Sequence, residues 1–490
     1  MSVEPTPTQP TAEEFSAMVH DLTSMTDGAV PSSSQMRAAR VLATTAASRL
    51  RHIFGTPTGW HWWDGMRWKP DGSNHARSEL FTVVEKHLPS LVLLGVLPKS
   101  TVSELQRDNS QRGALAIASH LPEFATELDH VDAQPTLLNC TNGTLDLETF
   151  QLHPHDPGDL LTQVTSTEYD PDASSPLWQS FLDVALPDVE VREYLQRLIG
   201  YSLLGVVTHH VFPILIGEGG NGKGTFYETI MHVLGDYAAP FDPSLLLMTR
   251  NDFKSANAPA PALLGLKGKR FVVTSETAEN AKLATDKMKF YTGGDTMVAR
   301  GMYAKSDTTW QPSHTMFMIT NHEPQLSADD AAAWQRITTI PFNIKIRGTK
   351  LEIPGFTIQL RQAAPAVLAW AVEGLKQFYE IGLAPPEQVV ARTESYHARV
   401  DHIATYMKTR LVPAPPTERV PRTEVWNDWL VWARAEDVDP GRQSDFYAKI
   451  TREFTPSKHS GVRVFTGVRL VLDSFEPSEE HEESIHNTEE

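Results

Sequence analysis

The sequence predicts an α/β protein whose core is a largely parallel β-sheet. From 210 to 345, short β-type runs alternate with helical ones, an order typical of strand–helix–strand units. Within this stretch the apolar run 211–216 is followed by a glycine-rich loop and then by 225–235, where apolar residues recur at helical spacing. The chain has 490 residues, enough for two to four domains, and an ordinary globular composition.

Bulk properties exclude some classes of protein. The formal net charge of −18 argues against a chain that coats nucleic acid with its whole surface, although a local basic site stays open. A single cysteine, Cys140, leaves no partner for an internal disulfide and no cysteine-built metal cluster. The start is polar and acidic, unlike a signal peptide, and the longest apolar run, 91–97, is too short to cross a bilayer. We therefore expect a cytoplasmic protein with no membrane partner.

The N-terminal third is expected to be mostly helical. Residues 1–33 are rich in Pro, Thr, Ser and Glu and are predicted to be flexible, and an N-terminal α+β domain is expected over 34–195. The predicted helical stretches are 34–54, 75–130 and 177–205, and a β-hairpin is predicted at 137–155 around an Asn-Gly turn.

Four tryptophans fall within residues 60–68, around an Asp-Gly turn. A β-hairpin with an aromatic face is the favoured interpretation. A platform on which nucleic-acid bases stack is the alternative.

The loop "GEGGNGKGTF" (217–226) predicts a phosphate site. Gly217, Gly222 and Lys223 match the pattern G-x-x-x-x-G-K, in which backbone N–H groups and a helix N-terminus surround phosphate oxygens and the lysine supplies a full charge. The next position is normally Ser or Thr, whose hydroxyl holds Mg²⁺, but here Gly224 precedes Thr225, so Thr225 is the candidate ligand. An ordinary glycine turn is the alternative. The expected cofactors are ATP and Mg²⁺, and the predicted binding residues are Gly217, Gly220, Asn221, Gly222, Lys223, Gly224 and Thr225.

Three polar residues at neighbouring strand ends are candidates for catalysis. Glu276 follows one predicted strand, where a carboxylate could hold Mg²⁺ or polarise water; a helix N-cap is the alternative. Asn321 follows the next strand and is a candidate sensor of the γ-phosphate, with a plain turn residue as the alternative. Arg336 precedes a third β-run and could reach a neighbouring subunit's nucleotide.

Taken together, these motifs resemble the superfamily 3 helicases of the phage and plasmid primase–helicase class, which includes poxvirus and satellite-phage replication proteins. The similarity runs from about 50 to 475. It is carried by "LLNCTNGTLDLETFQLHPHDP" (137–157), "LQRLIGYSLLG" (195–205), "GEGGNGKGTF", "SETAE" (275–279), "MKFYTGGDTMVARGMYAK" (288–305), "MITNHEP" (318–324) and "AAAWQRITTIPF" (331–342).

The resemblance implies an AAA+-like P-loop ATPase core over 196–345, followed by a helical segment over 346–408. Such proteins form a ring, usually a hexamer, that translocates on single-stranded DNA. A hairpin reaching the pore would place Tyr303 and Lys305 on DNA, with Asp295 and Arg300 coupling it to the nucleotide. Residues alone leave a solvated surface hairpin as the alternative.

Many members of this class carry a primase domain before the helicase. Here about fifty residues precede the resembling region, too few for that domain, so we expect no primer synthesis by this chain. A separate primase or host replication proteins would then be partners.

A winged-helix domain is expected over 409–474. The stretch 410–422 holds four prolines and is predicted to be a linker or stiff loop. Two predicted helices, the second over 444–454, precede a strand pair within 462–472 that turns at Thr-Gly. Basic residues are concentrated here, and Arg452, Lys458 and Arg463 are candidate DNA contacts, with a small packing domain as the alternative. The acidic tail 475–490 is expected to be disordered.

Three functions follow as hypotheses. The first is an ATP-dependent DNA helicase that replicates a phage, plasmid or mobile element and acts on single-stranded and forked DNA. The second is a replication initiator that binds origin DNA and uses ATP to control assembly. The third, a small-molecule kinase, needs neither a trans arginine nor a DNA-binding appendage and is disfavoured.

Overall fold

The computed structural model describes residues 16, 19–20, 33–248, 261–275, 282–301, 307–436, 438 and 440–471. These residues form two compact units. The first comprises Met1–Pro324 with Gln335–Val390, and the second comprises Gln325–Trp334 with Ala391–Glu490. Among the described residues, no helix combines the length and the apolar character needed to cross a membrane.

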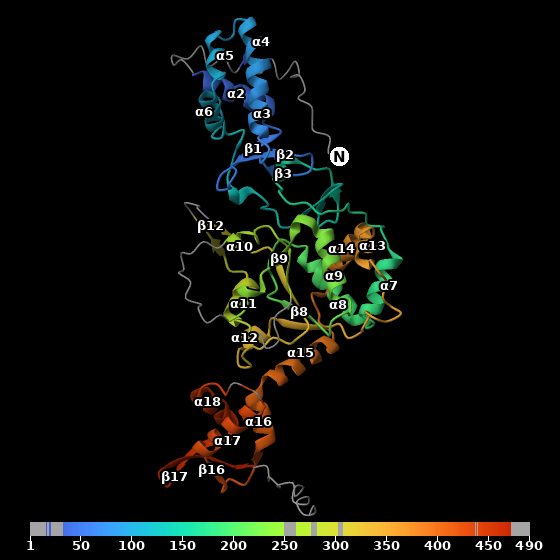
Figure 1. The fold of residues 1–490 in the computed structure, drawn as a ribbon, viewed down its shortest axis with the longest axis vertical. Helices are drawn as coiled ribbons and strands as arrows, with labels where there is room; N and C mark the ends of the chain where they lie inside the picture. The colour runs from blue at the N-terminus through green and yellow to red at the C-terminus, as the bar shows by residue number, and fades with distance from the viewer. Residues whose placement is uncertain are drawn as a thin grey trace, which may run out of the picture. The chain divides into compact units, whose positions relative to one another are not determined.

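The first unit begins with a helical region beside a small sheet (Figure 1). The sheet has the strand order β3-β2-β1-β4, and β2 pairs with β3 in the hairpin that the four tryptophans predicted. Trp68 is fully buried, and Trp60 packs edge-on against Phe124 with ring centroids 5.3 Å apart. The elements are α2 (Ser34–Ala46), β1 (Leu50–Ile53), β2 (Trp60–Trp63), β3 (Trp68–Pro70), α3 (His75–Thr82), a π-helical turn (Val83–His87), α4 (Leu88–Leu93), α5 (Ser100–Leu105), α6 (Asp108–Ala118) and β4 (Ala125–Thr126).

The single helix expected over 34–54 is wrong at its C-terminal end. The helix ends at Ala46, and Leu50–Ile53 form β1, in which Leu50 lies opposite Trp62 of the tryptophan hairpin. Local periodicity cannot detect this strand, because its hydrogen-bond partners come from the hairpin and from β4.

A second small sheet and two helices lead to the central sheet. Strands β5 (Leu137–Cys140), β6 (Gly143–Asp146) and β7 (Leu152–His153) pair antiparallel, as the Asn-Gly turn predicted. Helices α7 (Pro176–Ala185) and α8 (Val189–Ser202) follow. Helix α8 packs closely on α14 (Ala364–Ile381): a Cβ at Gly200 would lie 2.1 Å from the Leu375 nitrogen, so glycine allows this backbone approach.

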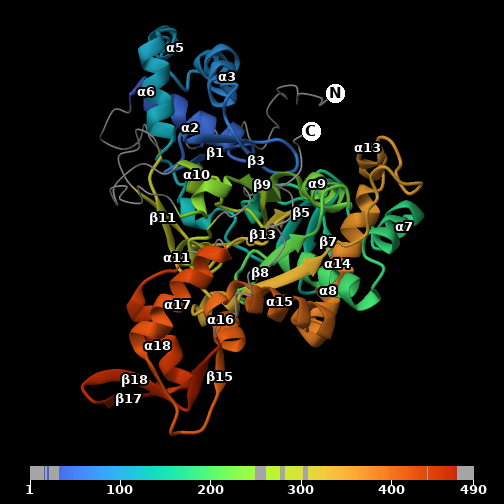
Figure 2. The ribbon, with the colours of Figure 1, turned by 60° about the horizontal axis from the view of Figure 1, so that its bottom comes forward.

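The central sheet has five parallel strands in the order β14-β8-β13-β10-β9. Strands β8 and β13 are buried along their whole length, which explains why they appear in the sequence as continuous apolar runs. Helices α8, α9, α13 and α14 cluster together (Figures 1 and 2). The predicted α/β fold with a parallel sheet and a helical N-terminal region is confirmed. The remaining bounds are β8 (Phe212–Ile216), α9 (Lys223–Leu234), β9 (Ala238–Phe241), α10 (Pro261–Leu264), β10 (Phe271–Ser275), α11 (Thr285–Tyr291), β11 (Met297–Ala299), β12 (Thr308–Trp310), β13 (Thr315–Thr320), β14 (Ile337–Pro341) and α13 (Phe356–Arg361).

The second unit has its own core, built around Tyr406, Trp429, Phe446 and Phe465. Figure 2 shows its helices α16, α17 and α18 with the β17–β18 hairpin. Its elements are α12 (Ala331–Trp334), most of α15 (Glu387–Val400), α16 (His402–Arg410), β15 (Leu411–Pro413), β16 (Arg419–Pro421), α17 (Arg422–Ala435), α18 (Gln443–Glu453), β17 (Thr455–His459), β18 (Val462–Thr466) and β19 (Val468–Leu470).

Two expectations for this unit are corrected. Strands β18 and β19 do not pair with each other across Thr466 and Gly467: β18 pairs with β16 and β17, and β19 pairs with β15. A single connecting residue, Gly467 with a φ of 73°, redirects the chain to a different sheet instead of closing a hairpin. The proline-rich stretch 410–422 is only partly a loop, because it contributes the short strands β15 and β16.

Candidate active site

The glycine loop joins β8 to α9 in a conformation that needs glycine. Gly220 and Gly222 have φ angles of 82° and 92°, in the left-handed region. A Cβ at Gly217 would lie 2.1 Å from the Phe342 carbonyl oxygen. Gly222 is the N-cap of α9, so the N–H groups of that helix's first turn follow the loop directly. Such a loop and helix N-terminus suit an anion.

Lys223, the first residue of α9, is buried and 4 % exposed. Its Nζ donates to the Gly217 carbonyl oxygen at 2.5 Å, to Asn221 Oδ1 at 3.1 Å and to Asn321 Oδ1 at 3.2 Å. The Asn221 amide is fixed in turn, since its Nδ2 donates to the Phe342 oxygen at 2.7 Å. The ammonium group therefore lies where β8 and β13 both end.

The strand order explains why these side chains meet. After β8 the chain continues to β9 at the far edge of the sheet, whereas β13 and β14 flank β8 on its two sides. Parallel strands place their carboxyl ends at one edge, and ligands bind where the strand order reverses. Asn321, directly after β13, thereby reaches Lys223, directly after the β8 loop.

A cavity of about 1030 Å³ opens at this point. Thr225 lines it, while a Cβ built at Gly224 would have no atom within 4 Å. Its walls come from α7, the glycine loop, the ends of β10 and β13, and residues 346–358. The lining residues include Leu177, Phe181, Gly219, Gly220, Asn221, Gly222, Lys223, Gly224, Thr225, Ser275, Asn321, Ile346, Arg347, Lys350 and Phe356.

Two of these walls were missed by sequence reasoning. The backbone N–H groups of Ile346 and Arg347 donate to the Gly220 oxygen at 2.8 and 2.9 Å, which holds residues 346–358 on the glycine loop. Phe181 of α7 contacts Phe356, with ring centroids 5.7 Å apart. Neither wall has a local motif, although the basic pair Arg347 and Lys350 could have suggested a site for anions.

Three other predicted site residues, Arg336, Asp295 and Arg300, do not line this cavity. Arg336 is half-buried, and its Nη1 donates within its own chain to the Lys289 oxygen at 2.5 Å and to Thr292 Oγ1 at 3.0 Å. Asp295 is exposed, and Arg300 directly follows β11; neither lines the cavity. Glu276, Tyr303 and Lys305 lie outside the described residues. Ser275, the residue before Glu276, does line the cavity.

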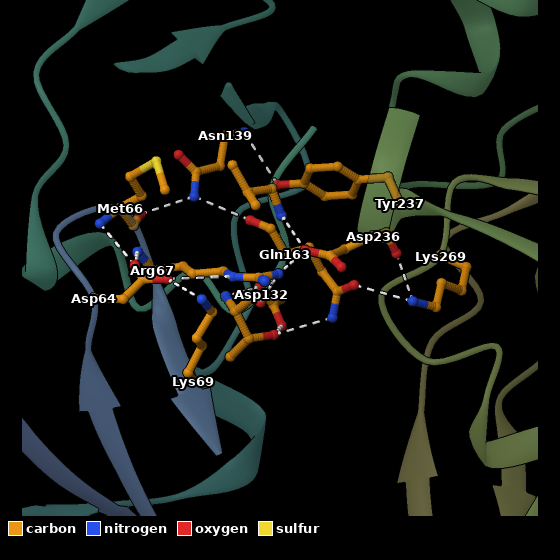
Figure 3. Close-up of polar contacts among 12 residues, drawn as sticks. Asp64, Met66, Arg67, Lys69, Asp132, Asn139, Gln163, Asp236, Tyr237 and Lys269 are labelled. Atoms are coloured by element: carbon orange, nitrogen blue, oxygen red, sulfur yellow. Dashed lines mark hydrogen bonds and ion pairs between the residues drawn. The ribbon is translucent and has the colours of Figure 1, made fainter. Parts of the chain in front are cut away.

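A partly buried polar network lies at the opposite ends of the strands (Figure 3). Arg67 forms an ion pair with Asp236, and Lys269 Nζ, just before β10, donates to Gln163 Oε1 at 3.1 Å. Asp132 is half-buried here; desolvation raises the pKa of its carboxyl, and hydrogen bonds from Thr162 oppose that rise. The network ties the N-terminal region to the strand starts and takes no part in the cavity.

The candidate DNA contacts of the second unit are placed on two elements. On α18, Arg452 Nη1 lies 3.4 Å from Asp329 Oδ1. In the β17–β18 hairpin, Lys458 and Arg463 are exposed and lie directly opposite each other. Like charges in this position repel, which favours an anionic partner for the hairpin.

Comparison with known proteins finds similarity to viral proteins named as putative helicases and primases. Residues 39–187 match a family described as "D5 N terminal like", and residues 215–336 match a "Family of unknown function (DUF5906)". The chain is 26 % identical over 338 residues to the mimivirus protein "Putative helicase L207/L206", covering 65 % of this chain and 35 % of that protein. It is 24 % identical over 341 residues to "Putative primase C962R" of African swine fever virus, covering 65 % and 35 %.

The matches confirm the resemblance to phage and viral primase–helicase proteins, and the chain spans about a third of the length of these curated relatives. A solved structure, "The A form apo structure of NrS-1 C terminal region-CTR", is 13 % identical over 61 % of this chain and 77 % of that one. The TM-score between the two structures is 0.39.

Proposed function

Because this chain is homologous to viral replication proteins named as helicases and primases, we propose that it is an ATP-dependent DNA helicase of superfamily 3. The observation that carries the proposal is the contact between Lys223 and Asn321 inside the cavity at the glycine loop. A lysine at the loop's end and a polar side chain on the adjacent strand end are what a γ-phosphate needs for binding and for sensing.

The described residues fit a nucleoside triphosphate. The glycine loop and the α9 N-terminus would hold the phosphates, and Lys223 would exchange its oxygen acceptors for β- and γ-phosphate oxygens. Mg²⁺ would neutralise charge on the phosphates. Such ions keep several waters and take few protein ligands, and the Thr225 hydroxyl, which lines the cavity, is proposed as one of them. Glu276 is proposed as the carboxylate that acts beside it.

We further propose that adjacent subunits of a ring, with six members by the resemblance, share each nucleotide. Arg336 does not line its own chain's cavity, which suits a role at a neighbour's site. To act there, its guanidinium must exchange the Lys289 and Thr292 oxygens for a phosphate. Such a trans arginine contributes roughly 10³–10⁵ to the hydrolysis rate.

The second unit is proposed to be a winged-helix domain that binds DNA. Helix α18 would be its recognition helix, and the β17–β18 hairpin would be its wing. Lys458 and Arg463, two positive side chains that face each other, would contact phosphates, because the negative charge of DNA relieves their mutual repulsion.

Mixing two inactive variants tests the shared site. Lys223→Ala removes the phosphate ligand and Arg336→Ala removes the trans arginine, so we expect neither alone to hydrolyse ATP. In a one-to-one mixture, about a quarter of the interfaces would join an intact lysine to an intact arginine, and DNA-stimulated hydrolysis would partly return. A mixture as inactive as its components would refute sharing, and hydrolysis without strand displacement on forked DNA would favour the initiator.

A further inference from the structure

The segment Gln325–Trp334 connects two residues of the proposed nucleotide site. Asn321 lies four residues before it, and Arg336 lies two residues after it. Nevertheless, this segment forms one compact unit with Ala391–Glu490 and not with the sheet. A movement of this segment can therefore shift Asn321 and Arg336, because the chain connects it to both residues.

Aromatic and hydrogen-bond contacts hold the segment within that unit. The Trp334 ring stacks on His397 of α15, with centroids 4.3 Å apart, and meets Tyr396 edge-on at 4.9 Å. His397 Nε2 donates to the Ala328 carbonyl oxygen at 2.8 Å. Trp334 and Tyr396 are buried, so this end of the segment is firmly packed.

The other contact is electrostatic and involves α18. Asp329 Oδ1 lies 3.3 Å from Lys449 Nζ and 3.4 Å from Arg452 Nη1. Lys449 also donates to Asp401 Oδ1 at 2.6 Å, so it keeps a carboxylate partner if Asp329 leaves. Arg452 is largely exposed, and among the described residues its acidic partner is Asp329.

We propose that Asp329 is a regulatory contact that occupies the basic face of α18 until a DNA phosphate displaces it. A carboxylate and a phosphate oxygen present the same charge-assisted acceptor to Arg452, so the two compete for one site. Displacement would free the Asp329 part of the segment between Asn321 and Arg336, while its Trp334 end stays packed on α15. DNA at α18 and nucleotide at the sheet would then be coupled, and each ligand would change the affinity for the other by the same factor.

This inference rests on the proposed function and has its own test. Asp329→Asn removes the competing charge, so we expect the full-length variant to bind duplex DNA roughly two- to five-fold more tightly at low salt, the range expected for an exposed ion pair. The ratio of DNA-stimulated to basal ATP hydrolysis should fall, because residue 329 is already detached from α18 before DNA binds. Asp329→Glu should restore both values.

Glu418→Gln is the matched control. Glu418 forms an exposed ion pair with Arg469 in the same unit, at 3.7 Å, and the substitution changes the net charge by the same amount. We expect Glu418→Gln to shift DNA affinity less than Asp329→Asn does and to leave the stimulation ratio unchanged. A further check is the double variant of Asp329→Asn with Arg452→Gln, which should show strong non-additivity in DNA affinity.

The measurements distinguish the role of Asp329 from the proposed function. Equal behaviour of Asp329→Asn and Glu418→Gln, with the wild type still stimulated by DNA, would overturn the role of Asp329 alone. A wild type that neither hydrolyses ATP nor binds DNA would overturn the proposed function itself.

Discussion

Reversing the charge of Lys458 should move stability and DNA binding in opposite directions. In the β17–β18 hairpin, Lys458 lies directly opposite Arg463, and both side chains are exposed. Lys458→Glu replaces a repulsive pair by an attractive one, which should stabilise the hairpin by about 0.2–1 kcal/mol. If the hairpin contacts DNA phosphates, losing one such contact should lower the slope of log K against log salt by about 1 and weaken duplex binding roughly tenfold.

Amide hydrogen exchange over 455–466 measures the local stability, and DNA titration at several salt concentrations measures the contact. Lys408→Glu is the matched control, since Lys408 is exposed on α16 in the same unit and its reversal gives the same net charge. Slower exchange together with weaker DNA binding, both beyond the control, supports the hairpin as a DNA contact. Unchanged DNA affinity relative to Lys408→Glu would refute the reasoning, whatever happens to stability.

Further predictions concern the cavity and the sheet. Lys223→Ala should weaken ATP binding roughly 100-fold, the effect of losing about 3 kcal/mol of charge-assisted hydrogen bonding, as measured by calorimetry. Gly224→Ser should raise the midpoint of thermal unfolding by about a degree, because a Cβ has open space in the first turn of α9 and serine is the better helix former. Thr225→Ala should raise the Mg²⁺ concentration needed for half-maximal hydrolysis. Adding Gly224→Ser should return that concentration toward the wild-type value. Burial lowers the pKa of His314 to about 4, so the unfolded state binds a proton at a higher pH than the folded state does. The free energy of unfolding should therefore fall by up to about 3 kcal/mol as the pH drops from 6.5 to 4. In denaturant titrations, His314→Gln should show a smaller dependence of that free energy on pH.

The sequence revealed the sheet because parallel strands are buried on both faces. Strands β8 and β13 therefore appear as uninterrupted apolar runs, and the glycines of the loop mark backbone angles that other residues avoid. From these two signals Lys223 and Asn321 are both predicted at carboxyl ends of strands, and parallel strands end at one edge of the sheet.

The strands and cavity walls that the sequence did not predict depend on contacts with segments distant in the chain. Strand β1 forms because the tryptophan hairpin and β4 pair with it. Strand β19 pairs with β15, which is distant in the sequence, and not with its neighbour β18. The cavity walls over 346–358 are fixed by hydrogen bonds to Gly220, which no local pattern encodes. Periodicity reports a segment's own burial, whereas these features depend on which segment comes alongside.

The hydrogen bonds of Arg336 suggest how ATP hydrolysis could be coupled to the segment proposed to contact DNA. Its guanidinium holds the C-terminal end of α11, through the Lys289 oxygen and Thr292, in the stretch 288–305 that resembles the motif leading to the DNA hairpin. An arginine that turns toward a neighbour's phosphate must leave these two acceptors, and each lost hydrogen bond costs about 1 kcal/mol or more. The neighbour's nucleotide would thus free the start of that stretch at the moment it gains its arginine. Under the proposed function, the same side chain would then serve as a catalytic group for one subunit and would hold or release the start of the stretch 288–305 in its own.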